Sequence, residues 1–333
     1  MPADSRRGVL LGATAYVLWG AFPLYFRLLQ RSGAVEVVAH RVLWSLVVCA
    51  ALLALTRGWP VVRQALLHPR ELVLPAVAAV LLALNWGVYI FAVNSGQVVE
   101  ASLGYFINPL VTVLLGVVVL RERLRPMQWS AVGIGAAAVV VLTVDYGRPP
   151  WIALILASSF GVYGLIKNRV GLRVGAVPSL TIETMVLAPL AVAGLAWFAA
   201  SGTSTFAANA PWQGVLLVTT GVITVVPLLC FAAAARRVPL STIGLLQYMT
   251  PVLQLLCGVL FLGESMALSR WLGFGIVWTA LIVLTLDGLR QARSNRRLRH
   301  APVLPGLQGT VTPPRAPDRA QATPPAPSIS PTA

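Results

Sequence analysis

Long apolar runs separated by short polar segments dominate this chain. A helix needs ~20 residues to cross ~30 Å of hydrocarbon, and ten runs of about that length recur along the sequence. We expect ten transmembrane helices over residues 8–28, 37–56, 72–94, 99–120, 128–144, 151–167, 180–200, 213–235, 240–262 and 270–289. The connections between them are too short to hold a soluble domain, so the helical bundle must carry the function.

The second half of the sequence repeats the first. The segment NPLVTVLLGVVVLRERLRPMQWSAVGIG, which begins at Asn108, matches TPVLQLLCGVLFLGESMALSRWLGFGIV, which begins at Thr250, at an offset of 142. LWGAFPL (18–24) matches SFGVYGL (159–165) at an offset of 141. The pattern predicts an all-α polytopic membrane protein with ten transmembrane helices in two five-helix repeats, 8–145 and 150–289. Because five is odd, the second repeat is inverted, and inverted repeats place a binding site at their interface.

Composition and charge support the membrane assignment. The chain is 57% hydrophobic and 11% charged, with a mean hydropathy of +0.80, which excludes a soluble protein. Of its 25 Lys and Arg residues, 20 fall on one side of the predicted membrane, four on the other and Arg41 within a span. Positive charge gathers on the cytoplasmic side, so we expect both termini there. The net charge of +15 then indicates contact with anionic membrane lipids rather than nucleic acid.

Neither the two ends of the chain nor its cysteine and histidine residues indicate a cofactor site. Residues 1–7 are expected to form a short cytoplasmic N-terminus, and 290–333 a basic stretch followed by a Pro-rich, disordered cytoplasmic tail. The three cysteines have no CxxC spacing, and the three histidines do not cluster. We therefore expect no metal and no cofactor.

Several segments together carry a family resemblance. They are LWGAFPLYFRLL, HRVLWSLVV, ASLGYFINPLVTVLLGVVVLRERL, MQWSAVGI, IETMVLAPL and PLLCFAAAARRVPLSTIGLLQYMTPV. The chain resembles the RarD branch of the EamA-type drug/metabolite transporters over about 8–289. A Leu-Gly-Glu-like element ends a span in each half, as Leu120-Arg121-Glu122 and as Leu262-Gly263-Glu264. The resemblance implies a multi-pass permease of the plasma membrane, which is the inner membrane in a bacterium.

Few ionisable residues lie within the predicted spans, and such residues are functional candidates because charge in a membrane is costly. Arg41 and Glu183 are 142 positions apart and fall at opposite mouths of the predicted bundle. We expect each mouth to close with a charge pair, Arg41 with Glu36 or Glu100 and Glu183 with nearby basic residues. The candidate gating or coupling residues are His40, Arg41, Glu100, Glu183 and Arg237. The alternative is that these side chains snorkel to the interface or form static pairs.

Proline, polar and aromatic residues define a candidate substrate cavity. Pro109 and Pro251 are expected to kink two matching helices and free backbone carbonyls. Aromatic rings with polar groups suit amphipathic ligands. The candidate substrate-binding residues are Trp19, Asn85, Trp86, Tyr89, Tyr105, Asn108, Tyr163, Gln247 and Tyr248. The alternative is that the prolines and aromatic residues serve helix packing.

These observations favour a secondary transporter of small metabolites that works by alternating access. We expect an amphipathic or zwitterionic solute, such as an amino acid or a drug-like compound. An intramembrane enzyme is disfavoured because the spans hold no pair of aspartates and no HExxH motif. A non-transporting membrane sensor or assembly protein remains the alternative. The sequence leaves open which substrate is moved, the direction of transport, the coupling ion and whether the protein forms a homodimer.

Overall fold

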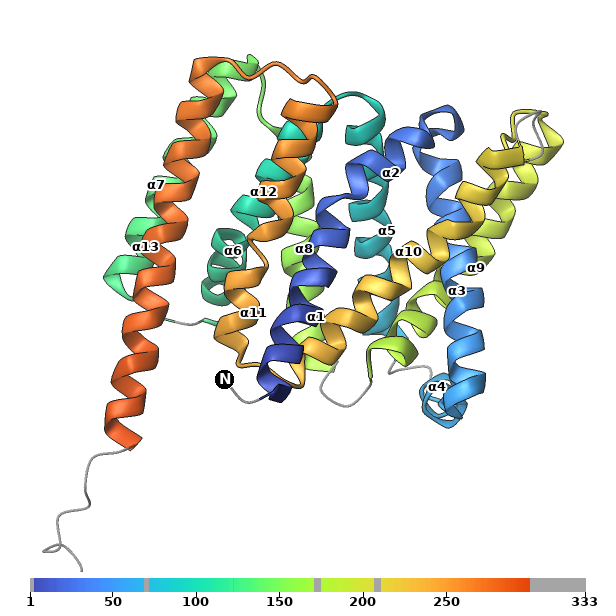
Figure 1. Cartoon of the computed structure of the whole chain (residues 1–333), viewed down its shortest axis with the longest axis horizontal. Helices are drawn as coiled ribbons and strands as arrows, with labels where there is room; N and C mark the ends of the chain where they lie inside the picture. The colour runs from blue at the N-terminus through green and yellow to red at the C-terminus, as the bar shows by residue number, and fades with distance from the viewer. Residues whose placement is uncertain (1–2, 69–71, 122, 171–174, 207–210, 300–333) are drawn as a thin grey trace, which may run out of the picture. The chain divides into compact units, whose positions relative to one another are not determined.

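The computed structural model describes residues 3–68, 72–121, 123–170, 175–206 and 211–299, and the described residues form helices and turns without strands. Glu122 and the Pro-rich tail lie outside them. The α-helices are α1 (Ala3–Gly20), α2 (Phe22–Leu28), α3 (Gly33–Thr56), α4 (Trp59–Leu66), α5 (Val73–Asn94), α6 (Val98–Leu120), α7 (Pro126–Tyr146), α8 (Trp151–Val170), α9 (Ala176–Ala200), α10 (Pro211–Ala235), α11 (Leu240–Leu246), α12 (Met249–Leu256) and α13 (Leu268–Arg299) (Figure 1). The turn η1 (Gln30–Ser32) precedes α3, and the π-helical turn η3 (Cys257–Phe261) follows α12.

The predicted spans coincide with observed helices. Within the described residues, nine helical segments are long and apolar enough to cross a membrane, and Trp151–Lys167 is a shorter apolar helix between them. The chain is therefore an all-helical, multi-pass membrane protein. The sequence pattern did not predict α4, a short helix that begins with Trp59 and Pro60 after the α3 C-terminus.

Two spans are broken into shorter helices. Ala21 separates α1 from α2, and Pro23 falls in the first turn of α2, where a missing amide costs no helical hydrogen bond. Gln247 and Tyr248 separate α11 from α12, whose first turn contains Pro251 (Figure 1). Pro251 has no amide to bond the carbonyl of Gln247, four residues earlier, so one helical hydrogen bond is missing at the break. In contrast, α6 continues as one helix through Pro109.

Helices that lie far apart in sequence pack against each other in matching pairs. The contact of α1 with α10 corresponds, at the repeat offset, to the contact of α8 with α5. In the same way, the contact of α6 with α8 corresponds to the contact of α12 with α1. The contact of α3 with α10 corresponds to the contact of α9 with α5. The pairs α3–α9 and α6–α12 each join a helix to its own counterpart.

Small residues allow the closest of these contacts. A Cβ atom on Gly221 of α10 would lie 2.4 Å from the backbone of Trp44 in α3. A Cβ on Gly104 of α6 would lie 2.8 Å from the carbonyl oxygen of Ala153 in α8. Real side chains do not tolerate such distances, so these two glycines set the spacing of α3–α10 and α6–α8. Close backbone approach at small residues is the usual means of helix association in membranes.

Candidate substrate site

Arg41 is a buried cation without an acidic partner in the part of the chain that the structure describes. Its side chain belongs to α3, and the residue is 4% exposed. Nε donates a hydrogen bond of 2.8 Å to Oγ1 of Thr224 in α10. The two terminal guanidinium nitrogens have no hydrogen-bond partner among the described residues, and no described carboxylate forms an ion pair with them. A buried charge normally requires a partner, so the described residues leave the charge of Arg41 without a counter-charge.

Aromatic rings surround the guanidinium. Its central carbon lies 4.0 Å from the ring centroid of Trp86 in α5. The same carbon is 5.3 Å from the ring centroid of Phe26 and 5.4 Å from that of Phe22, both in α2. Phe22 and Phe26 are four residues apart and therefore share one face of α2. Cation–π attraction partly replaces the lost hydration of Arg41.

Three polar residues extend this cluster towards α8. Asn85 donates through Nδ2 to the carbonyl of Leu156 and to Oγ of Ser159, at 3.1 and 3.0 Å. Its Oδ1 accepts a hydrogen bond of 3.3 Å from the Tyr105 hydroxyl. The rings of Tyr105 and Tyr89 lie 5.9 Å apart, and the Tyr89 ring packs at 6.2 Å on Phe26, which contacts Arg41. We name Arg41, Asn85, Trp86, Tyr89 and Tyr105 the Arg41 cluster.

The Tyr89 hydroxyl adds a second unsatisfied group to the Arg41 cluster. Tyr89 is 2% exposed, and its hydroxyl has no hydrogen-bond partner among the described residues. A buried hydroxyl without a partner costs about 1–3 kcal/mol. One cation without an ion-pair partner and one hydroxyl without a hydrogen-bond partner among the described residues thus belong to the same cluster.

A second polar cluster surrounds Glu183 in α9. Lys167 of α8 lies 2.5 Å from Oε1 of Glu183, and the Tyr163 hydroxyl donates to Oε2 at 3.2 Å. Ser179 donates to the same carboxylate at 3.2 Å. Phe160 links this group to the Arg41 cluster, because its ring centroid lies 6.0 Å from that of Tyr163 and 6.3 Å from that of Tyr105. Glu183, unlike Arg41, thus has an oppositely charged partner.

The acidic residues expected to pair with Arg41 bind other groups. Glu100 accepts hydrogen bonds from Arg148 at 2.8 Å and from the backbone amide of Ile152 at 3.0 Å. Glu36 accepts hydrogen bonds from the amide and hydroxyl of Thr205, both at 2.8 Å. The expected charge pair between Arg41 and either carboxylate is therefore absent among the described residues, since Glu100 binds Arg148 and the start of α8 and Glu36 binds the connection that follows α9.

Two further gating candidates also lie outside the Arg41 cluster. The His40 ring stacks on Phe206 with 4.9 Å between centroids. Arg237 pairs with Asp4 at 3.2 Å, and their side chains are 36% and 75% exposed. Arg237 forms no described contact with Glu183.

The other predicted cavity residues are divided between neighbouring regions. Trp19 packs on Tyr16 and Phe231, at 5.5 and 5.8 Å between ring centroids. Asn108 lies in α6 beside Gly161, and its buried Oδ1 has no partner among the described residues. Gln247 and Tyr248 form the break between α11 and α12. The structure thus joins Asn85, Trp86, Tyr89 and Tyr105, with Tyr163 beyond Phe160.

Sequence analysis missed Phe22, Phe26 and Thr224 as neighbours of Arg41. The i, i+4 spacing of the two phenylalanines was a usable signal, whereas Thr224 is 183 residues from Arg41 and gave none.

Sequence analysis also missed the contact made by Glu264, which accepts backbone hydrogen bonds from Val98 at 2.6 Å and Val99 at 2.8 Å. Burial raises the pKa of the Glu264 carboxyl above its ordinary value, and the two amides oppose that shift.

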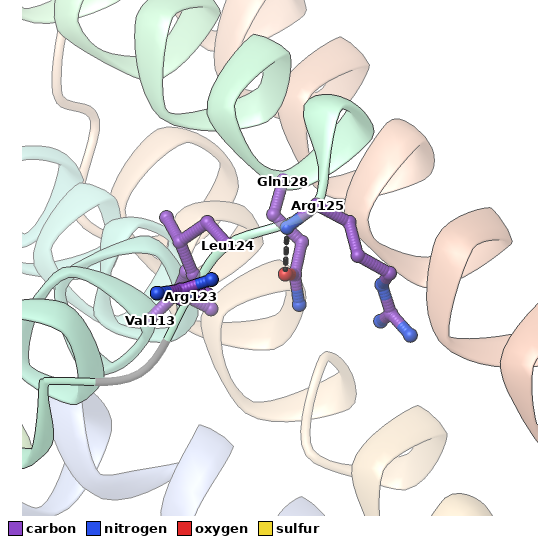
Figure 2. Close-up of a pocket in the computed structure, with 5 residues that line it drawn as sticks. All are labelled: Val113, Arg123, Leu124, Arg125 and Gln128. Carbon is purple, nitrogen blue, oxygen red and sulfur yellow. Dashed lines mark hydrogen bonds between the residues drawn. The ribbon is translucent and has the colours of Figure 1, made fainter.

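A cavity of about 410 Å³ lies elsewhere, at the connection between α6 and α7 (Figure 2). It is lined by Val113, Arg123, Leu124, Arg125 and Gln128. The Arg125 amide donates to Oε1 of Gln128 at 3.0 Å, which closes the first turn of α7. This cavity shares no residue with the Arg41 cluster. Among the described residues, no group of His, Cys, Asp and Glu is arranged to hold a metal ion.

Comparison with known proteins agrees with this architecture. The EamA-like transporter family matches the chain twice, over residues 6–144 and 149–286. The chain therefore belongs to the EamA-like transporter family. Within the drug/metabolite transporter superfamily it falls in the RarD branch.

Individual relatives cover most of the chain. Protein RarD of Streptomyces exfoliatus is 53% identical over 293 residues, which are 88% of this chain and 92% of the relative. An uncharacterized transporter of Pseudomonas aeruginosa is 45% identical over 87% of this chain and 97% of its own length. One crystal structure aligns with a TM-score of 0.56 over 85% of this chain and 98% of its own, at 20% identity. That similarity concerns the fold alone.

Proposed function

We propose that this protein is a secondary transporter that moves small amphipathic or zwitterionic metabolites by alternating access. The buried Arg41 cluster carries this proposal. It brings one cation, one amide and three aromatic residues from α3, α5 and α6 together inside the helical bundle. Buried polar groups of this kind are costly in a membrane protein and mark substrate pathways. Membership in a transporter family supports the same conclusion.

Alternating access requires two halves that can exchange roles, and the proposed halves are two inverted five-helix repeats, 8–145 and 150–289. The matched helix pairs support this arrangement, because α1–α10 and α8–α5 correspond at the repeat offset. Ion pairs support it as well. Asp145 of α7 binds Ser269 and Arg270 near the start of α13, and its counterpart Asp287 in α13 binds Arg125 at the start of α7.

The proposed location is the bacterial inner membrane, with both termini in the cytoplasm. The Lys and Arg distribution supports that orientation. Membrane lipids and a small-molecule substrate are the proposed partners. A homodimer is compatible with this proposal but is not needed for it, since the Arg41 cluster is built from one chain.

Reconstitution of the full-length chain into liposomes tests the function. Liposomes are preloaded with one unlabelled metabolite of a broad panel, and counterflow of the labelled compound is measured. We expect saturable exchange of at least one amphipathic compound, with none in protein-free liposomes. Folded, correctly inserted protein that exchanges no member of the panel would favour the non-transporting alternative.

A further inference from the structure

We propose that Arg41 binds the carboxylate of the transported substrate, and that this substrate is a monocarboxylate with an apolar or aromatic body. The inference rests on the proposed transport function and deepens it by naming the substrate class. Arg41 is buried in an apolar bundle, and no acidic side chain of the described chain pairs with it. A ligand that brings one negative charge completes the site.

Comparison of the two repeats shows that the missing partner is specific to Arg41. Glu183 is the residue 142 positions after Arg41, and Tyr163 is 141 positions after Phe22. The contacts correspond too: Arg41 lies over the Phe22 ring, and Glu183 accepts a hydrogen bond from Tyr163. Glu183 is neutralised by Lys167 within the protein. At the matching place in the first repeat, no described residue supplies a counter-charge, and we assign that role to the ligand.

The orientation of the guanidinium selects the geometry of the ligand. Thr224 occupies Nε, so the two terminal nitrogens remain as a pair of parallel donors. A carboxylate accepts two such bonds side by side. Among the described residues placed against Arg41 there is no second basic side chain. One cation matches a singly charged carboxylate, whereas a phosphate carries up to two charges at neutral pH.

The rest of the Arg41 cluster suits an apolar body. Trp86 offers a ring surface at the charged end, and the paired rings of Tyr89 and Tyr105 extend the aromatic surface of the cluster. The unpartnered Tyr89 hydroxyl supplies one further polar contact for the ligand. An amino acid with an aromatic or branched side chain belongs to this class, as does its deaminated analogue. An amine without a carboxylate does not, because it would place a second cation beside Arg41.

Binding of a matched ligand series to the full-length protein in nanodiscs tests the inference. The series is 3-phenylpropionate, 3-phenylpropanol, 3-phenylpropylamine and 2-phenylethylphosphonate, measured by isothermal titration calorimetry. A hydrogen-bonded charge pair corresponds to about ten- to a hundredfold in affinity, so the carboxylate is expected to bind at least ~10-fold more tightly than the alcohol. Arg41→Gln should reduce this preference to within about twofold, while the control Arg270→Gln, whose partner is Asp145, should retain it.

Each result decides the inference. A wild-type protein that binds none of the series, or that prefers the alcohol, amine or phosphonate, overturns it, as does a carboxylate preference that survives Arg41→Gln. If Arg41→Gln does not fold, Thr224→Val decides instead: weaker carboxylate binding with unchanged alcohol binding supports the inference, and unchanged carboxylate binding overturns it. If the protein exchanges uncharged solutes but shows no preference for the carboxylate, this inference fails and the proposed transport function stands. If the protein exchanges no solute at all, the transport function fails as well.

Discussion

Asp145 in α7 accepts a hydrogen bond of 2.8 Å from Nε of Arg270, two residues after α13 begins. The counterpart of Asp145 in the second repeat is Asp287, which pairs with Arg125 at the start of α7. Two pairs thus fasten α7 to α13, one towards each end of α7. Because α7 and α13 share few close backbone contacts, side chains hold them together, including Leu142 and Phe274 in one apolar cluster.

The Asp145–Arg270 pair is expected to contribute to stability. Both side chains are mostly buried, with 10% and 28% exposed, so solvent screens them less than a surface pair. A double-mutant cycle of Asp145→Asn and Arg270→Gln should give a coupling of about 0.5–3 kcal/mol. The measurement is unfolding in a denaturing detergent. The exposed pair of Arg237 and Asp4 is the control and should couple by less than ~0.5 kcal/mol; equal coupling in both pairs would contradict this account.

A methyl group added at Gly221 should destabilise the bundle. Its Cβ would lie 2.4 Å from the Trp44 backbone, which can move only if α3 and α10 separate. We expect Gly221→Ala to cost about 1–3 kcal/mol. Gly194→Ala in α9 is the matched control because its Cβ would meet nothing within 4 Å. Thermal unfolding of both variants checks this, and equal melting temperatures would rule out close packing at Gly221.

Single cysteines test the orientation of the chain. In a background without Cys49, Cys230 and Cys257, cysteines at Ser95 or Thr203 should react from outside intact cells with a membrane-impermeant reagent. Cysteines at His68 or Arg123 should react only after the membrane is opened, because basic segments stay in the cytoplasm. Labelling at Arg123 in intact cells would refute the inverted arrangement.

Glu183 offers a test of proton coupling. Glu183→Gln removes the charge that Lys167 neutralises and resembles permanent protonation of the carboxyl. If transport is driven by protons, this variant should lose net proton-driven transport and keep substrate exchange. Asp145→Asn, which neutralises a carboxylate outside this cluster, is the control and should keep proton-driven transport. Normal proton-driven transport by Glu183→Gln would exclude this residue from coupling.

Removal of residues 301–333 should leave insertion and transport nearly unchanged. The deleted segment holds no apolar run, and the basic stretch 290–299 stays in place. The amount of protein in the membrane and the initial transport rate check this expectation. A loss of either one in the 1–300 chain would assign the tail a structural role.

The helices were predictable because each depends on a local apolar run. The span that begins at Val98, for example, needs no distant residue to identify it. The surroundings of Arg41 were not predictable. The sequence favoured Glu36 or Glu100 as its partner, but Thr205 and Arg148 bind those carboxylates from distant segments. Similarly, Pro109 and Pro251 occupy matching positions in sequence, yet only the second accompanies a helix break, since the surrounding packing decides how a proline is accommodated.

The contact of Glu264 with the amides of Val98 and Val99 has a consequence for biogenesis. Those amides begin α6 and have no partner within their own helix, and the carboxylate that binds them lies 166 residues later in the chain. At 5–20 residues per second, a ribosome needs roughly 10–30 s to make that intervening stretch. During this interval the first turn of α6 must be hydrated or bound by the insertion machinery. The first half of the protein therefore becomes a finished structure only after the second half has been synthesised.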